Sequence, residues 1–259
     1  MQAFTYQVPT SVADAKASAA KGAKLMAGGQ SLLPSMRLGL SQPGAVADLS
    51  GVPGLRGITA SGGVVRIGAM TTHAEVAASA EVAKAIPALS QLAANIGDRQ
   101  VRNRGTIGGS LANADPAACY PAAVLGLGAT IHTDRRDIAA DDFFKDLYTT
   151  ALAEDEVITA VSFPVPEKAG WQKFKQPASR FSLVGVFTSK GPKGVRVAVT
   201  GAASCAFRAK ALEARLASNY SATALAGATV AADGLSTDLH GSAEYRAALI
   251  PVLAARAVG

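Results

Sequence analysis

Two glycine-rich segments constrain this chain more than any other feature of its sequence. Residues 27–31 (AGGQS) directly follow a short apolar run, and residues 104–110 (RGTIGGS) form the second segment. Paired glycines adopt positive φ and let backbone N–H groups approach a ligand without a Cβ atom in the way. Successive N–H groups in such turns form an anion-binding concavity, and Ser31, Thr106 and Ser110 add hydroxyl donors beside it.

The two segments together could hold one diphosphate from both sides, and a purely structural role in tight turns is equally compatible with them. Neither G-x-G-x-x-G after a strand nor G-x-x-x-x-G-K-[ST] occurs, which disfavours the usual dinucleotide fold and the P-loop. Arg102 and Arg104 flank the second segment. They either help to neutralise phosphates or are ordinary surface charges.

The composition indicates a globular protein, because 49% of the 259 residues are hydrophobic and 17% are charged. The net charge of +6 comes from 25 Lys and Arg that are spread along the chain. Nucleic-acid binding favours a basic run or a patch with interleaved aromatic residues, so we expect no nucleic-acid partner. No stretch approaches the roughly 18 apolar residues of a membrane helix, so we expect no transmembrane segment.

The chain offers no metal site or catalytic set of its own. Cys119 and Cys205 are too few and too separated for a disulfide framework, a zinc site or an iron–sulfur site. The three histidines lack metal-binding spacing, and no nucleophile, base and orienting residue can be assembled. The acidic clusters at 141–142 and 154–156 are predicted to be solvated surface. We therefore expect a cytoplasmic protein whose redox chemistry, if any, comes from an organic cofactor or a partner chain.

Local patterns predict alternating strands and helices before a boundary at residues 164–170, which contain Pro164 and Pro166. Thr72 and Glu75 have the spacing of a capping box that starts a helix. The expected elements of this half are a helix at 11–21, strands at 24–26 and 45–49, a hairpin at 55–69, a helix with the stripe Leu89, Leu92 and Ile96, a helix at 117–126 and a strand at 157–163.

Beyond the boundary the pattern changes to strands followed by helices. The expected elements are strands at 181–188 and 195–200, joined by a turn at 190–194, and helices at 209–217, 222–231 and 243–258. This order predicts two α+β domains.

Four segments resemble one known family. Residues 24–34 (KLMAGGQSLLP) resemble the first FAD loop of the flavin-binding medium subunit of molybdenum hydroxylases, most closely that of aerobic carbon monoxide dehydrogenase and more distantly the flavin domain of xanthine dehydrogenase. Residues 96–110, 174–181 and 236–246 resemble the family's second loop, its returning flavin segment and its C-terminal helix. All four occur in the family's order over nearly the whole chain, and four motifs in register are specific.

The resemblance implies an α+β fold in two parts. Residues 1–165 would form a two-lobed FAD-binding domain of the vanillyl-alcohol-oxidase type, with lobes at about 1–55 and 56–165. Residues 170–259 would form a smaller α+β C-terminal domain like that of carbon monoxide dehydrogenase flavoproteins.

The resemblance also implies the cofactor-binding residues. The first loop would line the adenine diphosphate and the flavin, the second would hold the diphosphate and ribityl chain from the other side, and Ile96 and Gly97 would lie near the isoalloxazine. The full set is Lys24, Ala27, Gly28, Gly29, Gln30, Ser31, Leu32, Ile96, Gly97, Thr106, Ile107, Gly108, Gly109, Ser110, Cys119, Ile158, Lys175 and Phe181. Cys119 stands where the family usually has Asp, so FAD affinity or potential is expected to differ.

The function implied by the resemblance is electron transfer. FAD on this chain would collect electrons from iron–sulfur clusters on a small subunit, which receive them from molybdopterin on a large subunit, and would pass them to a quinone, NAD or another acceptor. The implied assembly is a heterotrimer doubled to a hexamer. Two alternatives stay open: a non-catalytic scaffold subunit of the same fold that has lost FAD, and a stand-alone flavin oxidase.

Overall fold

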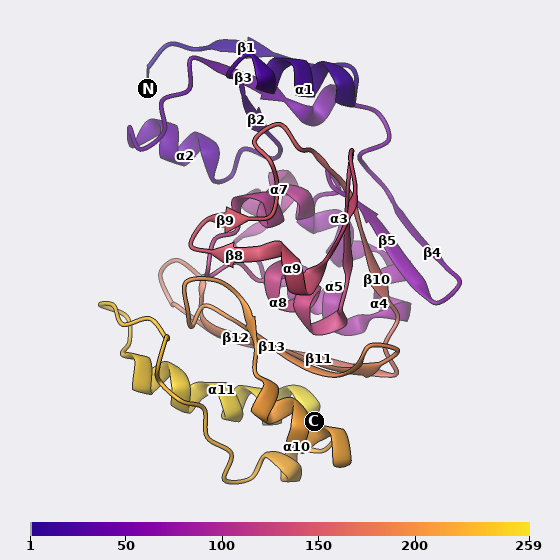
Figure 1. Cartoon of the computed structure of the whole chain (residues 1–259), viewed down its shortest axis with the longest axis vertical. Helices are drawn as coiled ribbons and strands as arrows, with labels where there is room; N and C mark the ends of the chain where they lie inside the picture. The colour runs from indigo at the N-terminus through magenta and orange to yellow at the C-terminus, as the bar shows by residue number, and fades with distance from the viewer. Residues whose placement is uncertain (1) are drawn as a thin grey trace.

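The computed structural model describes residues 2–259, and the chain forms three successive parts along its long axis (Figure 1). We call them the first lobe (residues 5–51), the second lobe (58–164) and the C-terminal part (168–258). The elements of the first lobe are β1 (Thr5–Gln7), α1 (Val12–Ala20), β2 (Lys24–Met26), α2 (Leu32–Arg37), β3 (Ala45–Asp48) and the 3-10 turn η1 (Leu49–Gly51).

The first lobe is built on a three-stranded parallel sheet in the order β1-β3-β2. This confirms the short strands predicted at 24–26 and 45–49. Ser11 caps α1 by accepting a hydrogen bond from the backbone N–H of Asp14, as residues of its type do at helix starts. The first glycine-rich segment begins directly after β2.

The second lobe contains a five-stranded antiparallel sheet in the order β4-β5-β10-β6-β7. Its strands are β4 (Ile58–Ser61), β5 (Val64–Gly68), β6 (Thr130–Thr133), β7 (Asp137–Ala139) and β10 (Ile158–Pro164), and a separate small ribbon pairs β8 (Phe144–Asp146) with β9 (Thr149–Thr150). The predicted hairpin is confirmed, since Gly62 and Gly63 supply the positive φ angles of its turn, 56° and 75°. The strand latest in sequence, β10, lies at the centre of the sheet.

Seven helices of the second lobe lie between its strands. They are α3 (His73–Ala78), α4 (Ala80–Ala85), α5 (Pro87–Ala94), α6 (Arg99–Arg104), α7 (Ile107–Asn113), α8 (Tyr120–Leu127) and α9 (Ala140–Phe143). The capping box predicted from Thr72 and Glu75 is present at the start of α3. Pro87 stands at the first position of α5, where its missing N–H leaves no helical bond unmade.

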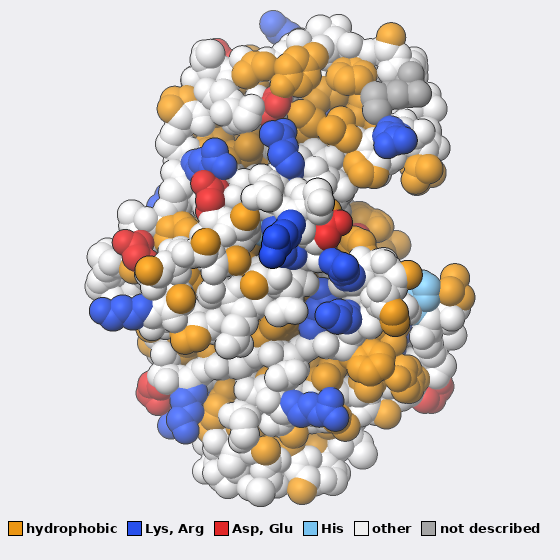
Figure 2. Space-filling view, turned by 180° about the vertical axis from the view of Figure 1, so that it is seen from behind, with side chains coloured by type: hydrophobic (Ala, Val, Ile, Leu, Met, Phe, Trp, Pro, Cys, Tyr) orange, Lys and Arg blue, Asp and Glu red, His pale blue; other side chains and the backbone are white. Residues whose placement is uncertain are grey.

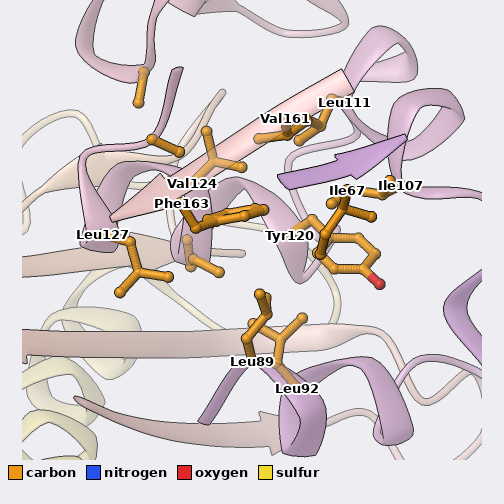
Figure 3. Close-up of a cluster of buried hydrophobic side chains, with 14 of the residues drawn as sticks. Ile67, Leu89, Leu92, Ile107, Leu111, Tyr120, Val124, Leu127, Val161 and Phe163 are labelled. Atoms are coloured by element: carbon orange, nitrogen blue, oxygen red, sulfur yellow. The ribbon is translucent and has the colours of Figure 1, made fainter. Parts of the chain in front are cut away.

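The main core fills the space between this sheet and these helices. Figure 3 shows side chains of β5, β10, α5, α7 and α8 pointing into one cluster. Tyr120, Phe163 and Leu92 are fully buried there. Apolar burial of this kind contributes roughly 25 cal/mol per Å² removed from water and fixes the helices on the sheet.

The C-terminal part is a four-stranded antiparallel sheet, β11-β12-β13-β14, followed by helices. Its elements are β11 (Lys168–Lys175), β12 (Ser182–Gly191), β13 (Gly194–Thr200), β14 (Phe207–Arg208), α10 (Lys210–Ser218), the 3-10 turn η2 (Ala222–Leu225) and α11 (Ala243–Val258). Helices cover both faces of this sheet (Figure 1). A Cβ on Gly126 of α8 would lie 2.7 Å from the Phe187 ring, and a Cβ on Gly170 would lie 1.7 Å from the Ala257 carbonyl oxygen of α11.

Several sequence expectations differ from the structure. The helix predicted at 222–231 is wrong, because only η2 is helical and Gly227 follows with a φ of 66°. The second glycine-rich segment is not a free loop, since residues 107–110 form the first turn of α7. The predicted boundary at 164–170 overlaps β11, where Gly170 packs closely against α11. The division of the chain into domains at this point remains a prediction.

The prediction that residues 154–156 form a solvated acidic cluster is wrong for Glu156, which is 5% exposed. Its carboxylate accepts hydrogen bonds from the Arg136 guanidinium (2.9 Å to each oxygen), the Thr133 hydroxyl (2.8 Å) and the Ala153 N–H (3.0 Å). These donors, the Arg136 guanidinium foremost, lower the pKa of Glu156 to about 2. The carboxylate therefore stabilises the folded chain only while it is ionised.

Glu156→Gln should lower the free energy of unfolding at pH 7 by about 2 kcal/mol, because it removes charge-assisted hydrogen bonds. The native contribution is complete above the unfolded pKa of about 4.3 and is lost as the pH falls from there towards the folded pKa. The difference between wild type and variant, measured by urea unfolding, should thus shrink between pH 5 and the acid limit of the fold. The matched control is Glu154→Gln, since Glu154 is exposed. An equal loss in both variants would contradict the assignment.

Candidate functional site

The structure brings the two glycine-rich segments into direct contact. Gly28, which follows β2, lies so close to the end of α6 that a Cβ would be 1.9 Å from the Arg104 carbonyl oxygen and 2.8 Å from the Cα of Gly105. A Cβ on Gly109 would lie 3.0 Å from that of Ala27. Only glycine at position 28 permits this approach of backbone to backbone. The contact joins the first lobe to the second lobe at the candidate site.

Backbone N–H groups of the second segment are hydrogen-bonded within the protein. The N–H groups of Ile107 and Gly108 donate to the carbonyl oxygens of Thr71 (3.1 Å) and Ala69 (2.8 Å), and the Gly109 N–H donates to the Thr106 hydroxyl (3.1 Å). A Cβ on Gly108 would lie 2.6 Å from the Cβ of Ala69. Glycine at 108 therefore serves packing inside the second lobe.

The first segment has the opposite character. Within residues 2–259, no hydrogen-bond acceptor pairs with the N–H groups of Gly28, Gly29, Gln30 or Ser31, and the Ser31 hydroxyl makes no capping bond. Gly29 has a φ of 72°, which its lack of a side chain permits. Consecutive unpaired N–H groups around a positive-φ residue form a cradle for an anion. This loop fits a diphosphate. The structure therefore supports anion binding by the first segment more strongly than by the second, whose N–H groups are paired within the protein.

A turn at residues 95–97 precedes α6 and is held by the Arg102 side chain of that helix. The Arg102 guanidinium donates to the carbonyl oxygens of Ile96 (2.9 Å) and Gly97 (3.2 Å). Gly97 has a φ of 50°. Arg102 thus holds the turn that contains two predicted flavin contacts, Ile96 and Gly97. The sequence had suggested for Arg102 only phosphate neutralisation or a surface charge.

The His73 side chain packs against Gly105 of the second segment. A Cβ on Gly105 would lie 2.6 Å from Nε2 of His73, and the His73 backbone N–H donates to the Gly105 carbonyl oxygen at 2.9 Å. Burial lowers the pKa of His73 to about 4, so the ring is neutral near pH 7. It acts as a packing surface under the glycine rather than as a charged group.

Cys119 lies buried at the start of α8. Its Sγ is 3.4 Å from Nζ of Lys173 and 3.7 Å from the Ser182 hydroxyl. Nζ of Lys173 also donates to the Asn95 carbonyl oxygen at 3.1 Å. Lys173 therefore connects Cys119 to the turn at 95–97. Sequence reasoning chose Lys175 and missed Lys173, because strand β11 was not predicted. Regular alternation would place both side chains on one face, but the register of β11 against β12 shifts between Phe174 and Lys175.

The remaining predicted residues lie apart from this contact network. Lys24, Lys175 and Phe181 are exposed, whereas Leu32 packs against a small cluster with Met26 and Met36. Ile158 is 6% exposed in β10. Figure 2 shows the outline of the molecule indented between the first lobe and the rest.

Comparison with known proteins decides the family. Residues 2–166 match the family model described as the FAD binding domain in molybdopterin dehydrogenase. The chain belongs to this family. The predicted resemblance to the FAD-binding medium subunits of molybdenum hydroxylases is confirmed, and so is the α+β fold that it implies.

Full-length relatives agree with this assignment. The chain is 39% identical to the nicotine 6-hydroxylase medium subunit of Paenarthrobacter nicotinovorans, over 100% of this chain and 97% of the relative. It is 35% identical to the carbon monoxide dehydrogenase medium chain of Hydrogenophaga pseudoflava, over 98% and 96%.

Solved structures show the same similarity in three dimensions. A structure of carbon monoxide dehydrogenase from Hydrogenophaga pseudoflava matches with a TM-score of 0.90 at 35% identity, covering 99% of this chain and 96% of that one. Quinoline 2-oxidoreductase from Pseudomonas putida 86 matches with a TM-score of 0.88 at 32% identity, with the same coverage. Among the described residues, no helix is long and apolar enough to cross a membrane.

Gly28→Ala should separate the two segments, because its Cβ would overlap the Arg104 carbonyl group. We expect FAD affinity to fall at least about tenfold, a change of about 1.4 kcal/mol, and the thermal midpoint to fall as well. The measurement is a fluorescence titration of the FAD-free chain with FAD. Gly44→Ala is the matched control, since its Cβ would meet nothing within 4 Å. Undiminished affinity in Gly28→Ala would show that the contact does not shape the site.

Proposed function

We propose that this chain binds FAD between its two glycine-rich segments and passes electrons from iron–sulfur clusters on a partner subunit through FAD to an external acceptor. One observation carries the proposal: in a chain of the FAD-binding family, the loop with the unpaired N–H groups of residues 28–31 lies against Arg104 and Gly105 of the second segment. An anion such as the diphosphate of FAD would take up these donors.

The residues divide by role. Gly28, Gly29, Gln30 and Ser31 would bind the diphosphate with backbone donors, and Thr106 to Ser110 would close the site from the second lobe. Ile96 and Gly97, held by Arg102, would lie near the isoalloxazine, as would Phe181. The other positions proposed to contact FAD are Lys24, Ala27, Leu32, Cys119, Ile158 and Lys175.

FAD supplies the redox chemistry when it is bound, accepting and releasing one or two electrons. The task of this chain is to grip the cofactor, orient its ring and exclude competing reactions. The polar groups near the segments hold backbone carbonyls in place, as Arg102 and Lys173 do. This arrangement suits a subunit that transfers electrons without an acid–base pair of its own.

The proposed partners are an iron–sulfur small subunit and a molybdopterin large subunit, assembled as a dimer of heterotrimers. The names of two relatives, a medium subunit and a medium chain that this chain covers almost completely, support such a complex. We place the complex in the cytoplasm, where the two free cysteines of this chain would stay reduced. The acceptor is proposed to be a quinone or NAD.

The purified chain should show flavin absorption bands near about 370 and 450 nm and should release FAD on denaturation. The control is a chain stripped of cofactor and titrated with FAD and FMN, and only FAD should restore the bands. A colourless chain that refuses added FAD would favour the alternative of a scaffold subunit. Steady oxygen consumption by the lone FAD-loaded chain with small alcohols would favour the stand-alone oxidase.

Lys173→Met should weaken FAD binding about tenfold, because it releases the turn at 95–97 from its contact with Cys119. Cys119→Asp should preserve or tighten binding, since a carboxylate would pair with the Lys173 ammonium. The same titration measures both. Lys168→Met is the control, at an exposed position on the same strand. Weaker binding in Cys119→Asp than in wild type would contradict the proposed place of Cys119.

A further inference from the structure

A serine, a histidine and an aspartate from three neighbouring strands of the second lobe form a hydrogen-bonded row. Nδ1 of His132 (β6) lies 2.6 Å from the Asp137 carboxylate (β7), and Nε2 of the same ring lies 2.8 Å from the Ser162 hydroxyl (β10). None of the three belongs to the proposed FAD site. Sequence spacing did not reveal this set, because Ser162 is 30 residues away from His132 along the chain.

The row lies on the face of the five-stranded sheet that points away from the core. Val161 and Phe163, on either side of Ser162, are fully buried, and side chains alternate between the two faces along a strand. Helices α7 and α8 pack against β10 from the side of the core. The side chain of Asp137 is 65% exposed and that of His132 is 19% exposed, so solvent reaches the row.

The hydrogen bonds of the row fix which ring nitrogen carries the proton. An ionised carboxylate only accepts hydrogen bonds, so Nδ1 of the neutral His132 ring carries its hydrogen toward Asp137. Nε2 is left with a lone pair and accepts from the Ser162 hydroxyl. A nucleophile beside a base that a third group orients is the arrangement that activates serine for attack on a carbonyl carbon.

Arg66 places a positive charge beside Ser162. The two residues are direct partners in the antiparallel pairing of β5 with β10, so their Cβ atoms are about 4.5–5.5 Å apart on the same face of the sheet. Arg66 is exposed. A guanidinium at this position can donate to the oxyanion that forms when Ser162 attacks, and it attracts an ester that carries a carboxylate. The charge therefore favours anionic esters over neutral ones.

We propose that Ser162, His132 and Asp137 form a second, hydrolytic site on this chain and that its substrates are carboxylic esters that carry a negative charge. Oγ of Ser162 bonds to the carbonyl carbon while its proton passes to Nε2 of His132. The ester C–O bond then breaks, and the proton moves to the leaving alcohol. Water cleaves the acyl-serine and releases the acid, so no oxidant or reductant is consumed. This activity goes beyond the proposed function and does not depend on FAD.

The test is acetylation of the full chain by para-acetoxy-meta-nitrobenzoate, an aryl ester whose leaving group carries a carboxylate. Absorbance follows the released nitrophenol, and peptide mass spectrometry after an acid quench locates the acetyl group, which we expect on Ser162. Ser162→Ala should abolish this label. His132→Gln removes the base and Asp137→Asn removes the group that orients it, so each should slow acetylation at least about 100-fold.

Matched controls separate the row from ordinary surface groups. Ser61 is exposed on β4 of the same sheet, and His240 is exposed in the C-terminal part, so Ser61→Ala and His240→Gln should react as wild type does. Arg66→Gln should lose the preference for the charged ester over para-nitrophenyl acetate, which delivers the same acetyl group without a carboxylate. FAD content and the thermal midpoint, measured for every variant, distinguish a lost site from an unfolded chain.

Three outcomes would overturn the inference. Acetyl groups on lysines with none on Ser162 would show that this serine is not a nucleophile. Labelling of Ser162 at an unchanged rate in His132→Gln and Asp137→Asn would show that the row does not activate it. Equal rates with the charged and the neutral ester in wild type would remove the assigned substrate class. If Ser162→Ala fails to fold, Asp137→Asn, at an exposed side chain, decides the matter. A chain that acetylates Ser162 but binds no FAD would end the proposed function alone.

Discussion

The approach of Gly28 to the backbone of Arg104 and Gly105 is the contact on which the candidate site depends. A Cβ at position 28 would lie 1.9 Å from the Arg104 carbonyl oxygen, so the two chains touch without any side chain between them. Backbone atoms have no rotamers with which to adjust, so a shift of one closely packed backbone segment displaces the other. The same approach sets the loop that carries the unpaired N–H groups of residues 28–31 against the end of α6, next to the contact of Ala27 with Gly109 of α7. One contact therefore joins two lobes and completes an anion cradle.

Local sequence signals predicted the parts of the fold that depend on neighbours in the chain. The capping box at Thr72 and the hairpin turn at residues 61–63 are of this kind, because their partners lie within a few residues. The resemblance predicted that both glycine-rich segments bind FAD, and it identified the family. Glu156 escaped prediction because Arg136 and Thr133 are 20 and 23 residues away. Sequence also could not tell that Gly108 packs against Ala69 while residues 28–31 keep their donors free. Spacing identifies a glycine but not what faces it.

Basic side chains around the segments act on backbone rather than on a reacting group. Arg102 fixes the carbonyl oxygens at 96 and 97, and Lys173 holds the one at 95. His73, neutral because burial lowers its pKa to about 4, supports Gly105. A charged group already engaged in hydrogen bonds is a poor proton donor or acceptor for a substrate. Such a neighbourhood gives rigidity instead of acid–base chemistry, which is what an electron-carrying cofactor requires of its protein.

Helix α11 is held on the sheet of the C-terminal part near both of its ends. Near its C-terminal end the Ala257 carbonyl group packs on Gly170, and in its first turn Arg246 binds the carbonyl oxygens of Leu183 and Gly201. A helix of 16 residues spans about 24 Å at 1.5 Å per residue. The helix is thus fastened at both ends to one sheet whose other face rests on α8. Any change that shifts α11 along the sheet must also move Arg246, so its hydrogen bonds to Leu183 and Gly201 persist only while the whole layer stays packed.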